Sequence, residues 1–106
     1  MSVIKLKELD SYENMRGIIT KDVLKNENVQ VKNLKLKQGD VIPAHQVPVD
    51  VFFHVLEGKG TIIIGDESYT LEEKDFITCP PRTPMKVMAD KGDKFNILNV
   101  KTPALN

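Results

Sequence analysis

The chain has 106 residues, 41% of them hydrophobic, and its fifteen basic and fifteen acidic residues leave a formal net charge of zero. This length fits one domain, no apolar stretch is long enough to span a bilayer, and a nucleic-acid partner would call for an excess of Lys and Arg. Because the single cysteine, Cys79, cannot form an internal disulfide, we expect a cytoplasmic protein with no nucleic-acid and no membrane partner.

Apolar and polar residues alternate along most of the chain, which predicts strands. Residues 1–7 alternate and predict a strand in place of the continuous apolar segment of a signal peptide. The only helix that we predict lies near residues 11–15. Residues 29–32 and 34–37 both alternate but are out of phase with each other, which predicts a β-bulge at Lys32-Asn33.

The middle of the chain is richest in strand-forming residues. Residues 51–56 predict a strong strand and residues 61–64 another, and Gly58 and Gly60 predict that the two form a hairpin. Further short strands are expected at residues 68–71, 76–79, 85–89 and 95–101. Many short strands separated by turn residues favour an antiparallel barrel or sandwich.

Residues 51–56 are apolar on both faces, whereas a strand with one solvated face would alternate. If Val51, Phe53 and Val55 line the interior, His54 faces outward. The outer face then needs cover, either from the N-terminal strands or from a second subunit. We expect a homodimer packed sheet on sheet about a two-fold axis.

Five residues separate Gly39 from His45, and Gly58 follows at the end of the strong strand. This spacing resembles the first motif of the cupin superfamily: Gly, five residues, His, one residue, His, three or four residues, Glu, six residues, Gly. Val47 stands at the second His position and Val51 at the Glu position. The first motif is therefore present in its glycines and its first histidine only.

The second cupin motif runs Gly, five residues, Pro, one residue, Gly, two residues, His, three residues, Asn. Pro80 keeps the proline, while Lys74 and Arg82 stand at the two glycines. Met85 replaces the His and Ala89 the Asn. The resemblance to small single-domain cupins covers residues 31–103.

The resemblance implies an all-β fold, a double-stranded β-helix or cupin jelly-roll barrel of antiparallel strands. We expect one domain over residues 1–106, with a cupin core at about 31–103. Residues 1–30 would form N-terminal strands that pack on the barrel or on the dimer partner.

Metal-dependent members of the family hold a metal with three His and one carboxylate, and His45 is the single residue of that kind at these positions here. Valine cannot coordinate a metal, and the thioether of Met85 suits Cu(I) better than iron, manganese or zinc. We therefore expect no cofactor, with His45 as the first candidate ligand for any metal that does bind.

The predicted ligand pocket has His45 as its polar anchor and an apolar lining, and Arg82 near the opening could clamp a carboxylate or phosphate through its planar guanidinium. The same apolar side chains could instead fill a narrow barrel. Cys79 is expected to serve as a small buried hydrophobe. The pocket residues are His45, Val47, Val51, Phe53, Met85 and Arg82.

The predicted function is binding of a small, partly apolar molecule, without catalysis and with no catalytic residue assigned. One alternative is a metal-dependent or acid–base cupin enzyme, of the dioxygenase, isomerase or decarboxylase type, acting on a small organic acid. That enzyme would need Asp50 or His54 to join His45, and Asp50 would turn inward only if a bulge followed Pro48. The other alternative is a structural or regulatory module with a filled barrel.

Overall fold

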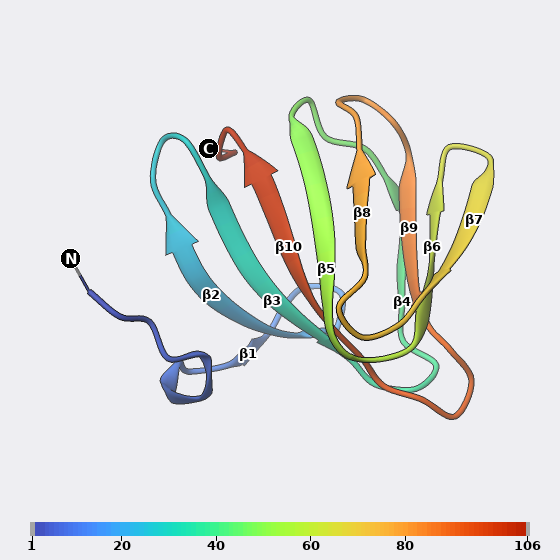
Figure 1. Ribbon diagram of the computed structural model, residues 1–106, viewed down its shortest axis with the longest axis horizontal. Coiled ribbons are helices and arrows are strands. Elements are labelled where there is room, and N and C mark those ends of the chain that lie inside the picture. Colours follow the sequence, from blue (N-terminus) through green and yellow to red (C-terminus); the bar gives the residue numbers. More distant parts are fainter. Residues whose placement is uncertain (1, 106) are drawn as a thin grey trace.

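The computed structural model describes residues 2–105, which form short antiparallel strands almost throughout (Figure 1). One short 3-10 helix, η1, precedes the strands in the described residues. The elements are η1 (Leu6–Glu8), β1 (Tyr12–Glu13), β2 (Ile19–Lys25), β3 (Gln30–Leu36), β4 (Val41–His45), β5 (Asp50–Gly58), β6 (Gly60–Ile64), β7 (Glu67–Leu71), β8 (Phe76–Cys79), β9 (Met85–Ala89) and β10 (Phe95–Thr102).

The strands form two sheets. The larger has the order β1-β2-β3-β10-β5-β8 and the smaller the order β4-β9-β6-β7, and all of these pairings are antiparallel. One hydrophobic core contains side chains from both sheets. The predicted all-β, antiparallel fold class is therefore confirmed.

Side chains alternate between the core and the outside along the central strands. In β5, Val51, Phe53 and Val55 are buried, whereas His54 on the opposite face is partly exposed. In β9, Met85, Val87 and Ala89 are buried in the same way. Each large side chain buried like this contributes about 1.5–3 kcal/mol to folding. The predicted inward and outward positions in β5 are thus confirmed.

The predicted hairpin between residues 51–56 and 61–64 is wrong. β5 pairs with β10 and β8, while β6 pairs with β7 and β9, so the segment between them carries the chain from one sheet to the other. Gly58 has a φ of 84°, and a Cβ there would overlap the backbone of Lys94. At Gly60 a Cβ would overlap the ring of Phe95. Because these glycines have no side chains, the chain can pass from one sheet to the other close to the start of β10. The sequence pattern of such a crossing is the same as that of a tight turn.

The N-terminal segment also differs from its prediction. Residues 2–5 have no regular secondary structure and Leu6–Glu8 are 3-10 helical, so the predicted strand at residues 1–7 is wrong over the described part; Met1 lies outside the described residues. The predicted helix at residues 11–15 is wrong as well. There the Asn14 Oδ1 accepts hydrogen bonds from the backbone N of Arg16 (2.9 Å) and of Ile18 (3.0 Å), a local turn that competes with helix formation. Within residues 2–105, no helix is long and apolar enough to cross a membrane.

The predicted bulge at Lys32-Asn33 is wrong because β3 pairs with β10 in unbroken register. The register shift lies instead in β2, between Asp22 and Leu24. Leu34 and Lys32 therefore share one face of β3, since side chains alternate along a regular strand. The apolar–polar alternation changes phase here because Lys32, a charged residue, occupies a position on the inner face of the sheet.

Two residues other than glycine, Lys74 and Arg82, have positive φ angles, 76° and 60°, among the described residues. They stand at the two glycine positions of the second cupin motif. A left-handed conformation costs an ordinary residue roughly 1–2 kcal/mol, so the turns keep the glycine geometry at some cost in stability.

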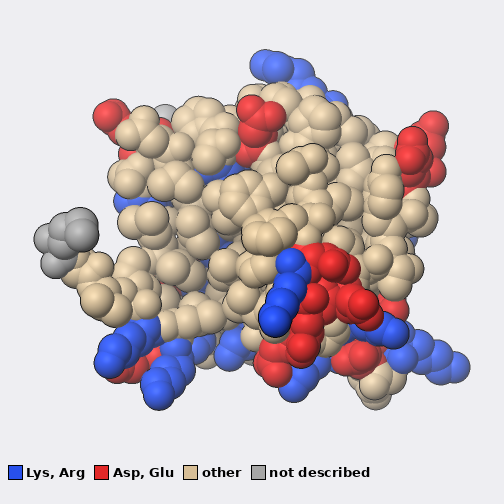
Figure 2. Space-filling view, in the orientation of Figure 1, with Lys and Arg blue, Asp and Glu red and all other residues tan. Residues whose placement is uncertain are grey.

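The outer face of β5 and β8 is largely free of charge. Figure 2 shows few Lys, Arg, Asp or Glu side chains over the middle of these strands, with charged side chains gathered below. On this face Phe76 is 64% exposed, its ring is stacked on His54 with ring centroids 4.0 Å apart, and Phe52 lies 6.2 Å from it. This is the apolar outer surface from which the homodimer was predicted.

If the homodimer forms through this face, Phe76→Glu is expected to convert it to a monomer, because two copies would bury the carboxylates against each other. Light scattering over a range of protein concentrations measures the mass directly. Val41→Glu, at a position 42% exposed on β4, is the matched control and should remain dimeric. A wild-type mass of 12.0 kDa at all concentrations would contradict the dimer.

Candidate functional site

A cavity of about 180 Å³ lies between the two sheets, near the end of β4. It draws side chains from β3, β5 and β10 of the larger sheet, from β4 and β9 of the smaller sheet, and from the turn after β1. The residues around it are Asn14, Arg16, Lys32, Leu34, Ile42, His45, Phe53, Val87, Asn99 and Lys101.

The inner wall of the cavity is apolar. Leu34 and Phe53 come from the larger sheet and Ile42 and Val87 from the smaller, and all four are buried. Ile42 and Val87 are register partners across the β4–β9 ladder. The packing of both sheets therefore fixes this wall, as in preformed ligand sites.

His45 is the last residue of β4 and lies opposite Met85 of β9. Its Nδ1 is 3.1 Å from the carbonyl oxygen of Pro43, which can only accept, so Nδ1 carries the proton of this hydrogen bond. Burial lowers the pKa of His45; this hydrogen bond opposes the shift, and the positive charges of Arg16 and Lys101 add to it. His45 therefore favours the neutral imidazole, with Nε2 as an acceptor.

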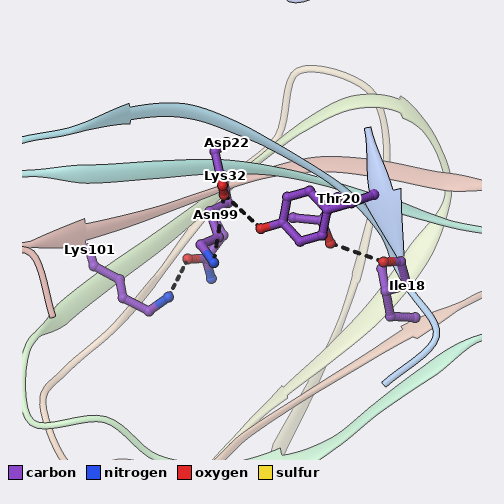
Figure 3. A network of polar contacts seen from close by, with 7 residues as sticks. Ile18, Thr20, Asp22, Lys32, Asn99 and Lys101 are labelled. Carbon is purple, nitrogen blue, oxygen red and sulfur yellow. Dashed lines mark hydrogen bonds and ion pairs between the residues drawn. The ribbon is translucent and has the colours of Figure 1, made fainter. Parts of the chain in front are cut away.

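Polar and cationic side chains form the remainder of the cavity lining. The Lys101 Nζ donates a hydrogen bond to the Asn99 Oδ1 at 3.1 Å (Figure 3). Burial lowers the pKa of Lys101, and the positive charges of Lys32 and Arg16 lower it further. The Lys32 Nζ lies 3.7 Å from the Asp22 carboxylate, which is largely exposed. The site thus combines an apolar wall with several cations held close together.

Of the predicted pocket residues, His45 and Phe53 meet at this cavity. Val51 and Met85 lie in the hydrophobic core, and Val47 packs against that core while remaining partly exposed. The Arg82 side chain is exposed on the loop between β8 and β9, where its backbone N donates to the Val47 carbonyl at 2.7 Å.

The side chains considered for acid–base chemistry lie elsewhere. Asp50 is exposed and pairs in register with Thr102, and His54 faces outward, its Nδ1 3.3 Å from the Asp75 carbonyl. Cys79 is 2% exposed, and burial raises the pKa of its thiol. The described residues therefore hold no Asp50–His45 hydrogen bond that could act as an acid–base pair.

The donor set does not fit the metal that the cupin fold implies. Nowhere in residues 2–105 do three or more His, Cys, Asp or Glu side chains gather in a way that could hold a metal ion. His45 stands at the family's ligand positions with Val47, Val51 and Met85, whereas iron, manganese and zinc need several nitrogen or oxygen ligands. These four residues therefore do not form a site for iron, manganese or zinc.

Sequence reasoning missed the polar residues of the cavity, Asn14, Arg16, Lys32, Asn99 and Lys101. The usable signal was a lysine in phase with buried residues: Lys32 is two residues from Leu34, and Lys101 is four residues from Ile97. Arg16 and Asn14 gave no such signal, because they lie in a turn outside any strand pattern.

The chain belongs to the cupin domain family, whose pattern it matches over residues 33–101. Its fold is similar to that of KdgF from Halomonas sp., with 22% identity, a TM-score of 0.89 and coverage of 98% of this chain and 96% of the other. It is also similar to the polyketide cyclase RemF from Streptomyces resistomycificus (12% identity, TM-score 0.87, coverage 98% and 80%). A third similar structure is the SPY1581 protein of unknown function from Streptococcus pyogenes (23% identity, TM-score 0.76, coverage 100% and 98%). No curated protein matches the sequence significantly.

Proposed function

We propose that this cupin binds a small molecule in the cavity beside His45, without the metal that its family often uses. The observation that carries the proposal is the cavity itself, in which an apolar wall from both sheets meets a histidine and several other polar groups. Such a combination is typical of small-molecule sites. His45 would orient the ligand by hydrogen bonding through its free ring nitrogen.

Two observations favour this function over the alternatives. A filled barrel would leave no space next to His45, whereas the cavity measures about 180 Å³. An acid–base enzyme would need a carboxylate or a second histidine beside His45, and Asp50 is exposed while His54 faces outward. The similar structures include a polyketide cyclase and a protein of unknown function, so the shared fold does not choose among these functions.

A fragment screen by NMR tests the proposal. The chain has two histidines, and a fragment bound in the cavity is expected to shift the imidazole signals of His45 while leaving those of His54 unchanged. Ile42→Phe, which narrows the cavity, should weaken this binding at least tenfold. Ile63→Phe, the same change on β6 of the same sheet but outside the cavity lining, should leave it within twofold.

The opposing results are equally clear. If no fragment shifts His45 selectively, or if folded Ile42→Phe protein binds as the wild type does, the cavity is not a ligand site.

Elemental mass spectrometry after dialysis with iron, manganese, zinc, nickel and copper should find far less than one metal per chain. Retention of one metal at near-stoichiometric amounts would contradict the metal-free site.

A further inference from the structure

The charged side chains that line the cavity are all basic. Arg16, Lys32 and Lys101 lie around it, and among residues 2–105 no carboxylate does. The chain as a whole has equal numbers of acidic and basic residues, so this grouping is local. Three cations on one small cavity repel one another and would favour a bound negative charge.

Within residues 2–105, the Lys101 ammonium has one hydrogen-bond acceptor and no carboxylate partner. It can donate three hydrogen bonds, and the Asn99 Oδ1 accepts one of them. The ion pairs of the described residues are Lys32–Asp22 and Lys94–Glu57, and neither includes Lys101. A partly buried ammonium without a carboxylate is costly for the free protein. A ligand anion would provide the missing acceptor.

The turn that carries Arg16 is itself well defined. Asn14 accepts two backbone hydrogen bonds within it, the Gly17 N donates to the Asn14 carbonyl at 2.9 Å, and the Asn14 N donates to the Ile18 carbonyl at 3.0 Å. The backbone that carries the Arg16 side chain is therefore held in a defined position beside the cavity. A planar guanidinium suits the two oxygens of a carboxylate.

The geometry points to a small organic carboxylate as the ligand, an inference that rests on the binding function proposed above. Its carboxylate would lie among Arg16, Lys32 and Lys101, and its carbon skeleton would lie against the apolar wall formed by Leu34, Ile42, Phe53 and Val87. The volume of about 180 Å³ suits a compact molecule, since a cavity of roughly 150 Å³ accommodates benzene. The apolar wall favours a carboxylate with a hydrocarbon part over inorganic phosphate.

Benzoate and benzamide test the charge requirement, because they have nearly the same shape and differ in charge. Calorimetric titration, with the His45 imidazole signals as a site-specific readout, is expected to show benzoate binding at least tenfold tighter than benzamide. Inorganic phosphate at the same concentration should leave the His45 signals unchanged.

Three lysine variants locate the charge. Lys101→Met and Lys32→Met keep an apolar stem and remove the ammonium, and each should weaken benzoate binding about tenfold while leaving benzamide binding within twofold. Lys35→Met is the control: Lys35 lies on the same strand as Lys32 but on the opposite face, so this variant should change benzoate binding by less than twofold. Circular dichroism and thermal melting verify that each variant is folded.

Each outcome separates the two proposals. If benzamide binds at the cavity as tightly as benzoate, or if folded Lys101→Met and Lys32→Met bind benzoate like the wild type, the inference of an anionic ligand is wrong. The proposed binding function would then still stand. If phosphate alone shifts His45, the ligand is an inorganic anion and the organic carboxylate is wrong. If neither these probes nor the fragment library shifts His45, both proposals are wrong.

Discussion

Gly60→Ala is expected to lower the free energy of unfolding by roughly 3 kcal/mol, at the upper end of the cost of overpacking a core. Gly60 is buried at the start of β6, and an added Cβ would overlap ring carbons of Phe95, which is itself fully buried. Its φ is not among the positive ones, so the cost comes from this overlap alone. Chemical denaturation measures the change.

The double variant Gly60→Ala/Phe95→Leu is the matched test of that cause. Removing the ring should relieve the overlap, so the double variant should lose less stability than the two single variants together. Strict additivity of the two losses, or a Gly60→Ala loss below about 1 kcal/mol, would show that the glycine is not required by the ring of Phe95.

Phe53→Ala is expected to cost about 3–5 kcal/mol, the usual loss when a buried phenylalanine is truncated. Phe53 is 1% exposed and also forms part of the cavity wall. The truncation would enlarge the space beside His45. We therefore expect 2-naphthoate, which is larger than benzoate, to shift the His45 imidazole signals in this variant more strongly than in the wild type.

Phe95→Ala separates the loss of stability expected for Phe53→Ala from the enlargement of the cavity. Phe95 is equally buried but is not a lining residue of the cavity, so this variant should lose similar stability without gaining naphthoate binding. Urea denaturation gives the stability of both variants. A Phe53→Ala loss below about 1 kcal/mol, or a gain of naphthoate binding in both variants, would contradict the dual role of Phe53.

Much of the fold was predictable because burial follows period-two alternation. The strands from β5 onward lie close to their predicted positions, and the inward positions of Val51, Phe53 and Val55 agree with the pattern. Among the strands from β5 onward, the exception is the pairing of β5 and β6. Two strands joined by a short glycine-containing segment form either a hairpin or a crossing between sheets, and the choice depends on partners far away in the sequence.

The candidate site was predicted less completely, and for a physical reason. Sequence reasoning placed inward residues by their hydrophobicity, so it found Phe53 and, through the family motif, His45. Lys32, Asn99 and Lys101 lie on inward positions but have polar side chains, and at Lys32 this was interpreted as a bulge. Polar residues that break a buried pattern are expected where binding matters more than stability.

The placement of β10 has a consequence for how the protein forms. β10 lies inside the larger sheet, between β3 and β5, although it is the last strand of the described chain (Figure 1). During synthesis β3 and β5 emerge first, and β10 follows about sixty residues after β3 and about forty after β5. The edges of β3 and β5 that pair with β10 stay open until then. Asn99 and Lys101 arrive on that same strand. Sheet closure and completion of the cavity therefore both require the insertion of β10, and a ligand could stabilise only chains in which that strand has been inserted.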